Sequence, residues 1–110
     1  RGLGDVYKRQ NYRSSMLSFF DDFDVLICPV NATTALPLDA PIDFSAFSYT
    51  MAYNMTGWPG TVIRANTDGN HLPVGIQVVA APFREDHSLA VAQWLETALG
   101  VFDPPAISAW

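Results

Sequence analysis

The stretch from residue 44 to residue 82 constrains the fold most, because a helical pattern, a sharp break and two strand patterns follow one another there. Four apolar side chains have spacings of three and four residues: Phe44, Phe47, Met51 and Met55. Such spacings place side chains on one face of a helix. Glycine and proline then fill three of the positions 57–60 and end that helix. Two β-rich runs, 61–64 and 74–79, predict strands.

The regions on either side extend this pattern into an α/β unit. A helix is expected over residues 11–22, followed by a short, fully buried strand at 24–29, because a continuous apolar run closed by proline is typical of a central strand. Residues 30–43 read as a loop, where an α/β protein places ligand contacts. A last helix is expected over 88–99, with Asp86 as N-cap and Gly100 at its end. Its predicted inward stripe is Leu89, Ala92, Leu95 and Leu99, with Trp94 beside it.

Composition limits the partners of this chain. It is 49% hydrophobic and 15% charged, which predicts surfaces that are covered by more protein. The net charge of −5 argues against a nucleic-acid partner, because phosphate contacts need a basic patch. No apolar run is long enough to predict a membrane span. The single cysteine, Cys28, cannot form an internal disulfide and indicates a cytoplasmic location.

The two ends of the sequence are set apart from its middle. Residues 1–10 look like a translated sequencing or cloning scar rather than native sequence, and we exclude them from the fold expectation. Residues 11–102 form the predicted domain portion. Residues 103–110 begin with Asp-Pro-Pro and are expected to form a tail.

Four motifs in a fixed order carry a resemblance to a known family. They are Asp24-x4-Pro29, Tyr53-Asn54-x2-Gly57-x-Pro59-Gly60, Leu72-Pro73-Val74-Gly75-Ile76-Gln77, and Arg84-Glu85-Asp86 leading into a helix. Together they resemble the C-terminal end of the amidase signature family. The run from Ser48 to Asn54 is similar to the fatty-acid-amide-hydrolase and small-amidase branch. One departure is His71, which stands where the family usually has glycine.

The resemblance implies an α/β fold with a mixed β-sheet covered by helices. It also implies a hydrolase that cleaves linear carboxylic amides to acid and ammonia or amine, with a Ser–Ser–Lys mechanism and no cofactor or metal. The family's catalytic lysine and glycine–serine loop lie upstream of the segment it resembles. The only lysine here is Lys8, so no catalytic residue is assigned and the fragment alone is expected to be inactive.

By the same resemblance, Phe47, Met51 and Phe83 line a substrate pocket, although the first two could equally be ordinary core. Other motif residues are expected to be structural: Asp24, Pro29, Asn54, Gly57, Pro59, Pro73, Gly75 and Gln77. Gly57 and Gly60 should permit a backbone that a side chain would obstruct, and Gly75 predicts close approach by a neighbour. Gln77 needs a buried hydrogen-bond partner.

Two other functions remain open at this point. One is the A subunit of a tRNA-dependent amidotransferase, against which the short loop 30–43 argues because it lacks an Asp-rich insertion. The other is a free-standing, non-catalytic α/β binding module. For the amidase, the expected partners are an apolar or aromatic small-molecule amide and the remainder of its own amidase domain. A homodimer of the full enzyme is left open.

Overall fold

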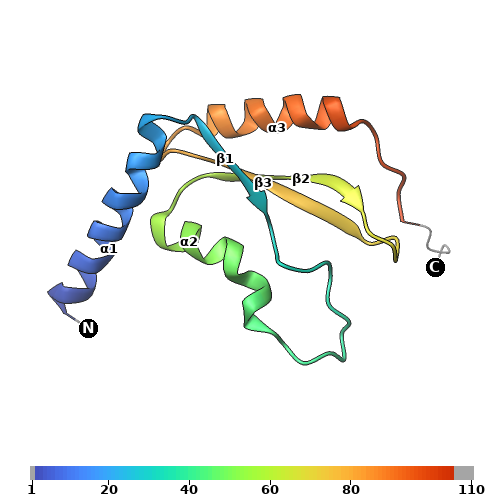
Figure 1. The fold of residues 1–110 in the computed structure, drawn as a ribbon, viewed down its shortest axis with the longest axis horizontal. Helices are drawn as coiled ribbons and strands as arrows, with labels where there is room; N and C mark the ends of the chain where they lie inside the picture. Colours follow the sequence, from blue (N-terminus) through green and yellow to red (C-terminus); the bar gives the residue numbers. More distant parts are fainter. Residues whose placement is uncertain (1, 106–110) are drawn as a thin grey trace.

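The computed structural model describes residues 2–105 and contains one three-stranded sheet with helices on both sides (Figure 1). The strands are β1 (Val25–Pro29), β2 (Gly60–Thr67) and β3 (Pro73–Ala80), in the order β1-β3-β2. Both pairs are antiparallel, with a bulge in β2 between Arg64 and Asn66. The α/β class is confirmed.

Helix α3 (Glu85–Leu99) covers one face of the sheet and forms the main core with it. Val78, Val79 and Ala80 have no exposed area. By strand alternation Val78 and Ala80 share the face that α3 covers, where Ala92 is almost fully buried. The Ser88 hydroxyl donates to the carbonyl oxygen of Val78 at 2.8 Å, which joins helix and sheet at the N-terminal end of α3.

The predicted inward stripe of α3 is wrong in part. Leu89, Leu99 and Trp94 are 59%, 44% and 71% exposed, whereas Ser88 and Ala92 are buried. Small side chains occupy the fully buried positions of α3, and Leu95 of the predicted stripe is half-buried. The helix begins at Glu85, with Arg84 as the N-cap residue and no side-chain cap from Asp86. It ends at Gly100 as expected.

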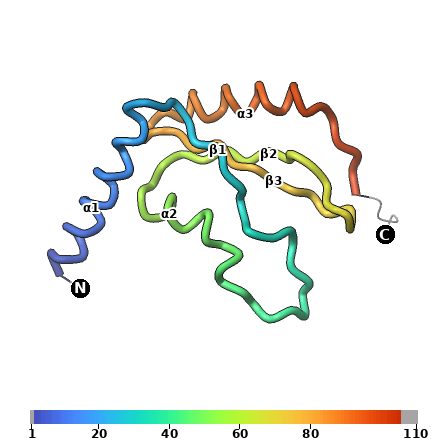
Figure 2. The backbone as a smooth tube through the Cα atoms, in the orientation of Figure 1, coloured from blue at the N-terminus to red at the C-terminus, as the bar shows by residue number. Residues whose placement is uncertain are grey.

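Helix α2 (Ser48–Thr56) lies on the opposite side of the sheet, and α1 (Leu3–Leu17) runs past the end of the sheet near the start of α3, as Figures 1 and 2 show. Two short 3-10 helices accompany them: η1 (Ser18–Asp21) follows α1, and η2 (Phe44–Phe47) precedes α2. The long loop 30–43 leads from β1 to η2 (Figure 2). The guanidinium Nε atoms of Arg9 and Arg13 donate to the carbonyl oxygen of Met55 at 3.2 and 3.0 Å, which joins α1 to the end of α2.

Helix α1 passes through the N-terminal decapeptide without a break, so the expected start at residue 11 is too late by eight residues. Whether residues 1–10 are native stays a prediction, as does the division at residue 102. Of the predicted tail, residues 103–105 form no helix or strand, and 106–110 lie outside the described residues.

Strand β1 differs from its expected central, fully buried position. It is an edge strand within the described residues, and Ile27 is 48% exposed. The apolar run correctly predicts a strand, but its outer edge and part of its surface have no neighbour among residues 2–105.

The break after α2 depends on Gly57 and not on Gly60. Gly57 has φ 73°, a left-handed conformation that disfavours any residue with a Cβ atom. At Gly60 a Cβ would lie 3.6 Å from Gln77 Oε1, which is ordinary contact, and φ is not positive. The predicted need for glycine at position 60 is therefore wrong.

The β2–β3 turn explains the departure at position 71. His71 has φ 63°, so the chain takes a left-handed conformation at the place where the family usually has glycine. The Asp68 carboxylate accepts the backbone N–H groups of Asn70 and Leu72 at 2.8 and 2.9 Å, and these bonds lower the pKa of Asp68. The turn thus keeps its shape without the glycine.

Candidate functional site

A cleft of about 710 Å³ opens between α2, the segment that follows β1, and the paired ends of β2 and β3. Its walls come from three parts of the chain: residues 29–35, Tyr49 of α2, and residues 62–64 with 73–75. Backbone and apolar groups predominate, and Asn31, Thr33, Thr34 and Tyr49 supply polar side chains. This composition suits a small, largely apolar ligand that is oriented by a few hydrogen bonds.

Gly75 shapes the floor of this cleft. A Cβ atom there would lie 3.3 Å from Val30 Cγ2 and 3.4 Å from Val62 Cγ1, tighter than ordinary packing. Close approach at Gly75 was predicted from the sequence and is confirmed. Pro73 begins β3 at one end of the cleft, and Pro29 ends β1 at the other.

Gln77 connects two of these walls. Its side chain is 5% exposed, and its Nε2 atom donates to the carbonyl oxygens of Pro29 at 3.0 Å and Tyr49 at 3.1 Å. The amide therefore holds the end of β1 beside the first turn of α2. The expectation of a buried partner for Gln77 is confirmed, and both partners belong to residues that line the cleft.

A second contact between β1 and α2 lies nearby. The Cys28 Sγ atom and the Tyr53 hydroxyl are 3.6 Å apart, within hydrogen-bond range for sulfur. Burial, followed by the neighbouring thiol, raises the pKa of the Tyr53 phenol, which therefore stays neutral at physiological pH. Tyr53 also packs near the buried Trp58.

The three predicted pocket residues lie outside the lining of the cleft. Phe47 and Met51 are 42% and 57% exposed on the η2–α2 segment, together with Phe44 and Met55. These four residues form an apolar face, here called the α2 face, that has little cover within residues 2–105. Phe83 is 89% exposed in the turn before α3, with φ 63°. Their contact with substrate stays a prediction.

The remaining motif residues occupy structural positions. Asp24 is exposed just before β1, and Asn54 is exposed on α2. Pro59 precedes β2, and its carbonyl oxygen accepts the N–H of Ala80 at 3.0 Å. Gly57 ends α2 in its left-handed conformation.

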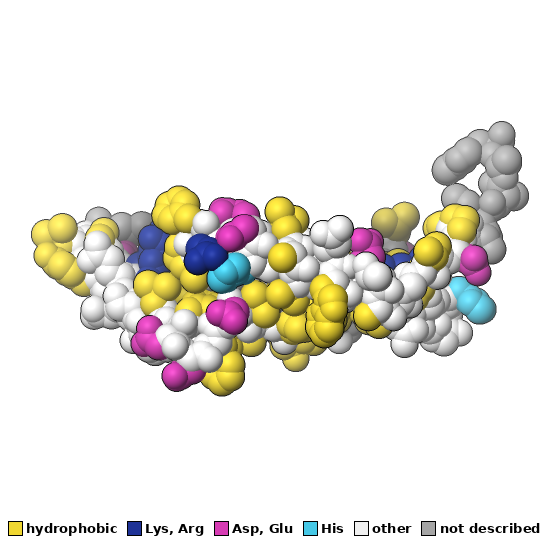
Figure 3. All heavy atoms as spheres, turned by 90° about the horizontal axis from the view of Figure 1, so that it is seen from above, with side chains coloured by type: hydrophobic (Ala, Val, Ile, Leu, Met, Phe, Trp, Pro, Cys, Tyr) yellow, Lys and Arg dark blue, Asp and Glu magenta, His cyan; other side chains and the backbone are white. Residues whose placement is uncertain are grey.

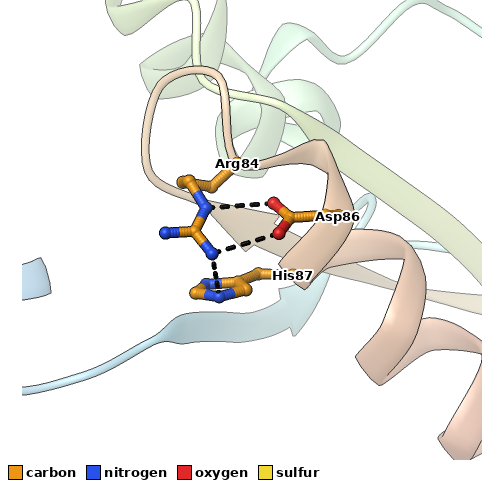
Figure 4. A network of polar contacts seen from close by, with 3 residues as sticks. All are labelled: Arg84, Asp86 and His87. Carbon is orange, nitrogen blue, oxygen red and sulfur yellow. Dashed lines mark hydrogen bonds and ion pairs between the residues drawn. The ribbon is translucent and has the colours of Figure 1, made fainter.

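A polar network lies at the N-terminal end of α3 (Figure 4). The Arg84 guanidinium donates two hydrogen bonds to the Asp86 carboxylate, both at 3.0 Å, and also contacts the His87 ring. These bonds lower the pKa of Asp86 and raise that of Arg84. Figure 3 shows Lys/Arg, Asp/Glu and His side chains gathered on this face among hydrophobic ones. The network is solvent-exposed and holds the turn before α3.

Neither the Ser88 hydroxyl nor the Lys8 amine lines the cleft. The buried Ser88 hydroxyl is bound to Thr61 Oγ1 at 2.6 Å and to a backbone carbonyl, so its role is structural. Lys8 is exposed on α1. Among residues 2–105, no group of three or more His, Cys, Asp and Glu side chains could hold a metal ion. No helix within this range is both long and apolar enough to cross a membrane.

The model of the amidase family matches residues 4–89. The chain belongs to the amidase family. Two solved structures have the same arrangement of elements. A crystal structure of an amidase has a TM-score of 0.79 at 28% identity, covering 86% of this chain and 24% of that one. The 6-aminohexanoate cyclic dimer hydrolase has a TM-score of 0.74 at 25% identity, covering 88% and 24%.

Two curated relatives of this amidase chain carry different names. Fatty-acid amide hydrolase 2 of Homo sapiens is 35% identical over 95 residues, which cover 83% of this chain and 17% of the relative. The glutamyl-tRNA(Gln) amidotransferase of Chromohalobacter salexigens has an A subunit that is 38% identical over 94 residues, covering 82% and 19%. The chain thus spans about a fifth of the length of the curated relatives it matches.

The sequence pointed to part of the cleft only. The loop after β1 was expected to hold ligand contacts, and residues 30–35 do line the cleft. Tyr49 was missed because the apolar stripe favours its neighbours Phe47 and Met51. Its signal is a phenol at the start of α2, between two apolar positions. Val62 was missed because strand alternation does not show which strand ends meet a distant loop.

Proposed function

We propose that this chain is the C-terminal portion of an amide hydrolase, and that it forms one wall of the substrate pocket. The parent protein hydrolyses linear carboxylic amides to a carboxylic acid and ammonia or an amine. A Ser–Ser–Lys mechanism operates from residues outside this chain, without metal or cofactor. The observation that carries this proposal is the amidase-family match over residues 4–89, supported by the solved amidase of the same arrangement.

The α2 face supports an apolar or aromatic substrate. Its four large side chains are 41–76% exposed, and a face of this kind is buried in a working protein by substrate or by further protein. Phe47 and Met51 contact the substrate in this proposal, and Phe83 approaches it from the turn before α3. The protein acts in the cytoplasm, where the lone Cys28 stays reduced.

The amidotransferase A subunit is the second candidate, because several relatives of similar identity carry that name. A protein of that kind would transfer ammonia within a complex and would need partner subunits. The free-standing binding module is the third candidate and is disfavoured by the exposed apolar faces.

One experiment separates these candidates. The longer reading frame that contains this chain is expressed, and ammonia or amine release is measured with a panel of aliphatic, aromatic and charged amides. We expect release from apolar and aromatic amides by the purified protein alone, and none from the 110-residue chain. Activity that appears only with glutamine and other co-purified proteins of a complex would favour the amidotransferase. Amide cleavage by the 110-residue chain alone would overturn the proposal.

A further inference from the structure

Among the described residues that line the cleft, Arg64 of β2 is the one that carries a charge. Alternate residues of a strand share a face, so Arg64 lies on the same side of the sheet as Val62, and its partner on β3 is Gly75. Both of these residues also line the cleft. Because Gly75 has no side chain, its place across the strand pair leaves room beside Arg64. The structure therefore puts a single positive charge at the β2–β3 end of an otherwise uncharged lining.

The guanidinium of Arg64 is held in place by three contacts. The β-bulge directly after Arg64 inserts one extra residue, which brings Thr67 to the same side of the strand. Arg64 Nη2 donates to Thr67 Oγ1 at 2.7 Å, and Nη1 donates to the carbonyl oxygen of Asp103 at 3.0 Å. The ring centroid of Phe102 lies 4.8 Å from Arg64 Cζ, within the range of a cation–π contact. A side chain fixed in this way has little conformational freedom left to lose when a ligand binds.

The same guanidinium keeps capacity for a further acceptor. It has five N–H donors, of which the two bonds above use two, and its buried Nε atom has no partner among the described residues. No carboxylate in the described part of the chain forms an ion pair with Arg64, although Glu96 borders an adjoining pocket. The nearest acid in sequence, Asp68, accepts the backbone N–H groups of Asn70 and Leu72 instead. The charge of Arg64 is thus available to an anion from outside the chain.

We propose that the cleft binds a small monocarboxylate and that Arg64 selects its head group. A guanidinium binds a carboxylate through short, charge-assisted hydrogen bonds, often two in parallel. The apolar part of the ligand packs against Val30 and Val62, which lie next to Gly75 on the floor of the cleft. One guanidinium balances one negative charge, so the site favours a carboxylate over a phosphate group, which carries nearly two.

A pair of ligands of equal chain length tests this proposal in the longer protein. Hexanoate and hexan-1-ol share an apolar body and differ in the charge of the head group, and ligand-observed NMR titration measures the affinity of each. We expect hexanoate to bind at least about tenfold more tightly, because hydrogen bonds to a charged group are the stronger ones. Equal affinities for the two ligands would overturn the proposal, and this comparison needs no variant.

Substitution of Arg64 separates ligand selection from a purely structural role. Arg64→Gln should remove the preference for hexanoate and leave the affinity for hexan-1-ol unchanged. Arg84→Gln, which removes a cation outside the lining of the cleft, is the matched control and should keep the preference. An equal loss of both ligands in Arg64→Gln would overturn the proposal, because it would mean that Arg64 only holds the C-terminal segment at Phe102 and Asp103.

Two sources supply this ligand chemistry: the acid released by the proposed reaction, and a free carboxylate that acts as an effector. Only the first rests on the proposed function. With the acid product as ligand, added hexanoate should inhibit the hydrolysis of hexanamide competitively, whereas an effector should change kcat. Arg64→Gln should abolish either effect. Absence of any amide hydrolysis, with the preference for hexanoate retained, would count against the proposed function and support the carboxylate site.

Discussion

The two sides of the sheet are built differently. On the α3 side, Val78 and Ala80 of β3 and Ala92 of α3 are buried, and the Ser88 hydroxyl donates a hydrogen bond to the carbonyl oxygen of Val78. On the α2 side, the large apolar residues of the α2 face point outward and are 41–76% exposed. The first side is completed within this chain, whereas the second carries apolar surface that needs another occupant. A helix of similar apolar content can therefore serve a core on one side and an interface on the other.

The largest expected effect on stability comes from placing a carboxylate on each side of the sheet in turn. Val78→Asp places a carboxylate in the core of the α3 side and should cost several kcal/mol, enough to prevent folding. Met51→Asp places the same group on the α2 face and should change the free energy of unfolding of the 110-residue chain by about 0.5 kcal/mol or less. Urea titration followed by circular dichroism measures both.

The Met51 variant also tests the occupant of the α2 face. In the longer protein, Met51→Asp should lower kcat/KM for apolar amides by about tenfold or more if this face contacts substrate. Met51→Leu, of similar volume, serves as the control and should retain activity. Equal activity of the Asp and wild-type proteins would mean that substrate does not approach Met51.

An intermediate loss of stability is expected at Gln77, which joins the end of β1 to the start of α2. Gln77→Met keeps the length of the side chain but removes both hydrogen bonds to the carbonyls of Pro29 and Tyr49. Two partly buried hydrogen bonds are lost, and the cost should be about 1–3 kcal/mol. Hydrogen exchange should accelerate in α2 more than in α3, because only α2 depends on this amide. Uniform acceleration across both helices would argue against a joining role.

The smallest effect is expected at the exposed end of α3. Hydrogen bonds from Arg84 lower the pKa of Asp86 below its ordinary value of 3.8. Because the folded-state pKa is the lower one, the stabilisation is complete above pH 3.8 and is lost as pH falls through the folded value. Asp86→Asn should remove this pH dependence and leave the stability of the α2 side unchanged. Carboxyl chemical shifts during an acid titration, with and without Arg84→Gln, measure the pKa directly.

The sequence predicted the elements well where local signals decide them. Gly57 and the apolar spacing before it predicted α2 and its end, and the two β-rich runs predicted β2 and β3. It failed where burial depends on protein beyond the chain. Leu89 and Leu99 were expected to face inward because apolar side chains in helices usually do, yet the buried residues of α3 are the small Ser88 and Ala92. The apolar sequence of β1 likewise predicted a central strand, whereas β1 is an edge strand within the described residues.

The candidate site was harder to predict than the fold, because its parts meet only in three dimensions. Residues 30–35, Tyr49 and the ends of β2 and β3 are separated by long stretches of chain. Gln77 could be recognised as a polar residue in an apolar strand, which required a partner. Its particular partners, the carbonyls of Pro29 and Tyr49, could not be recognised, because backbone carbonyls leave no mark in a sequence.

The two carbonyls held by Gln77 belong to two segments that line the cleft, the end of β1 and the start of α2. A single nitrogen atom therefore sets how far those segments can separate, and they cannot drift apart independently while both bonds persist. The conformational entropy of ordering the cleft is lost when the protein folds and not when a ligand arrives. A ligand that enters the cleft beside Pro29 and Tyr49 meets a preorganised opening, and more of its contact energy remains for affinity.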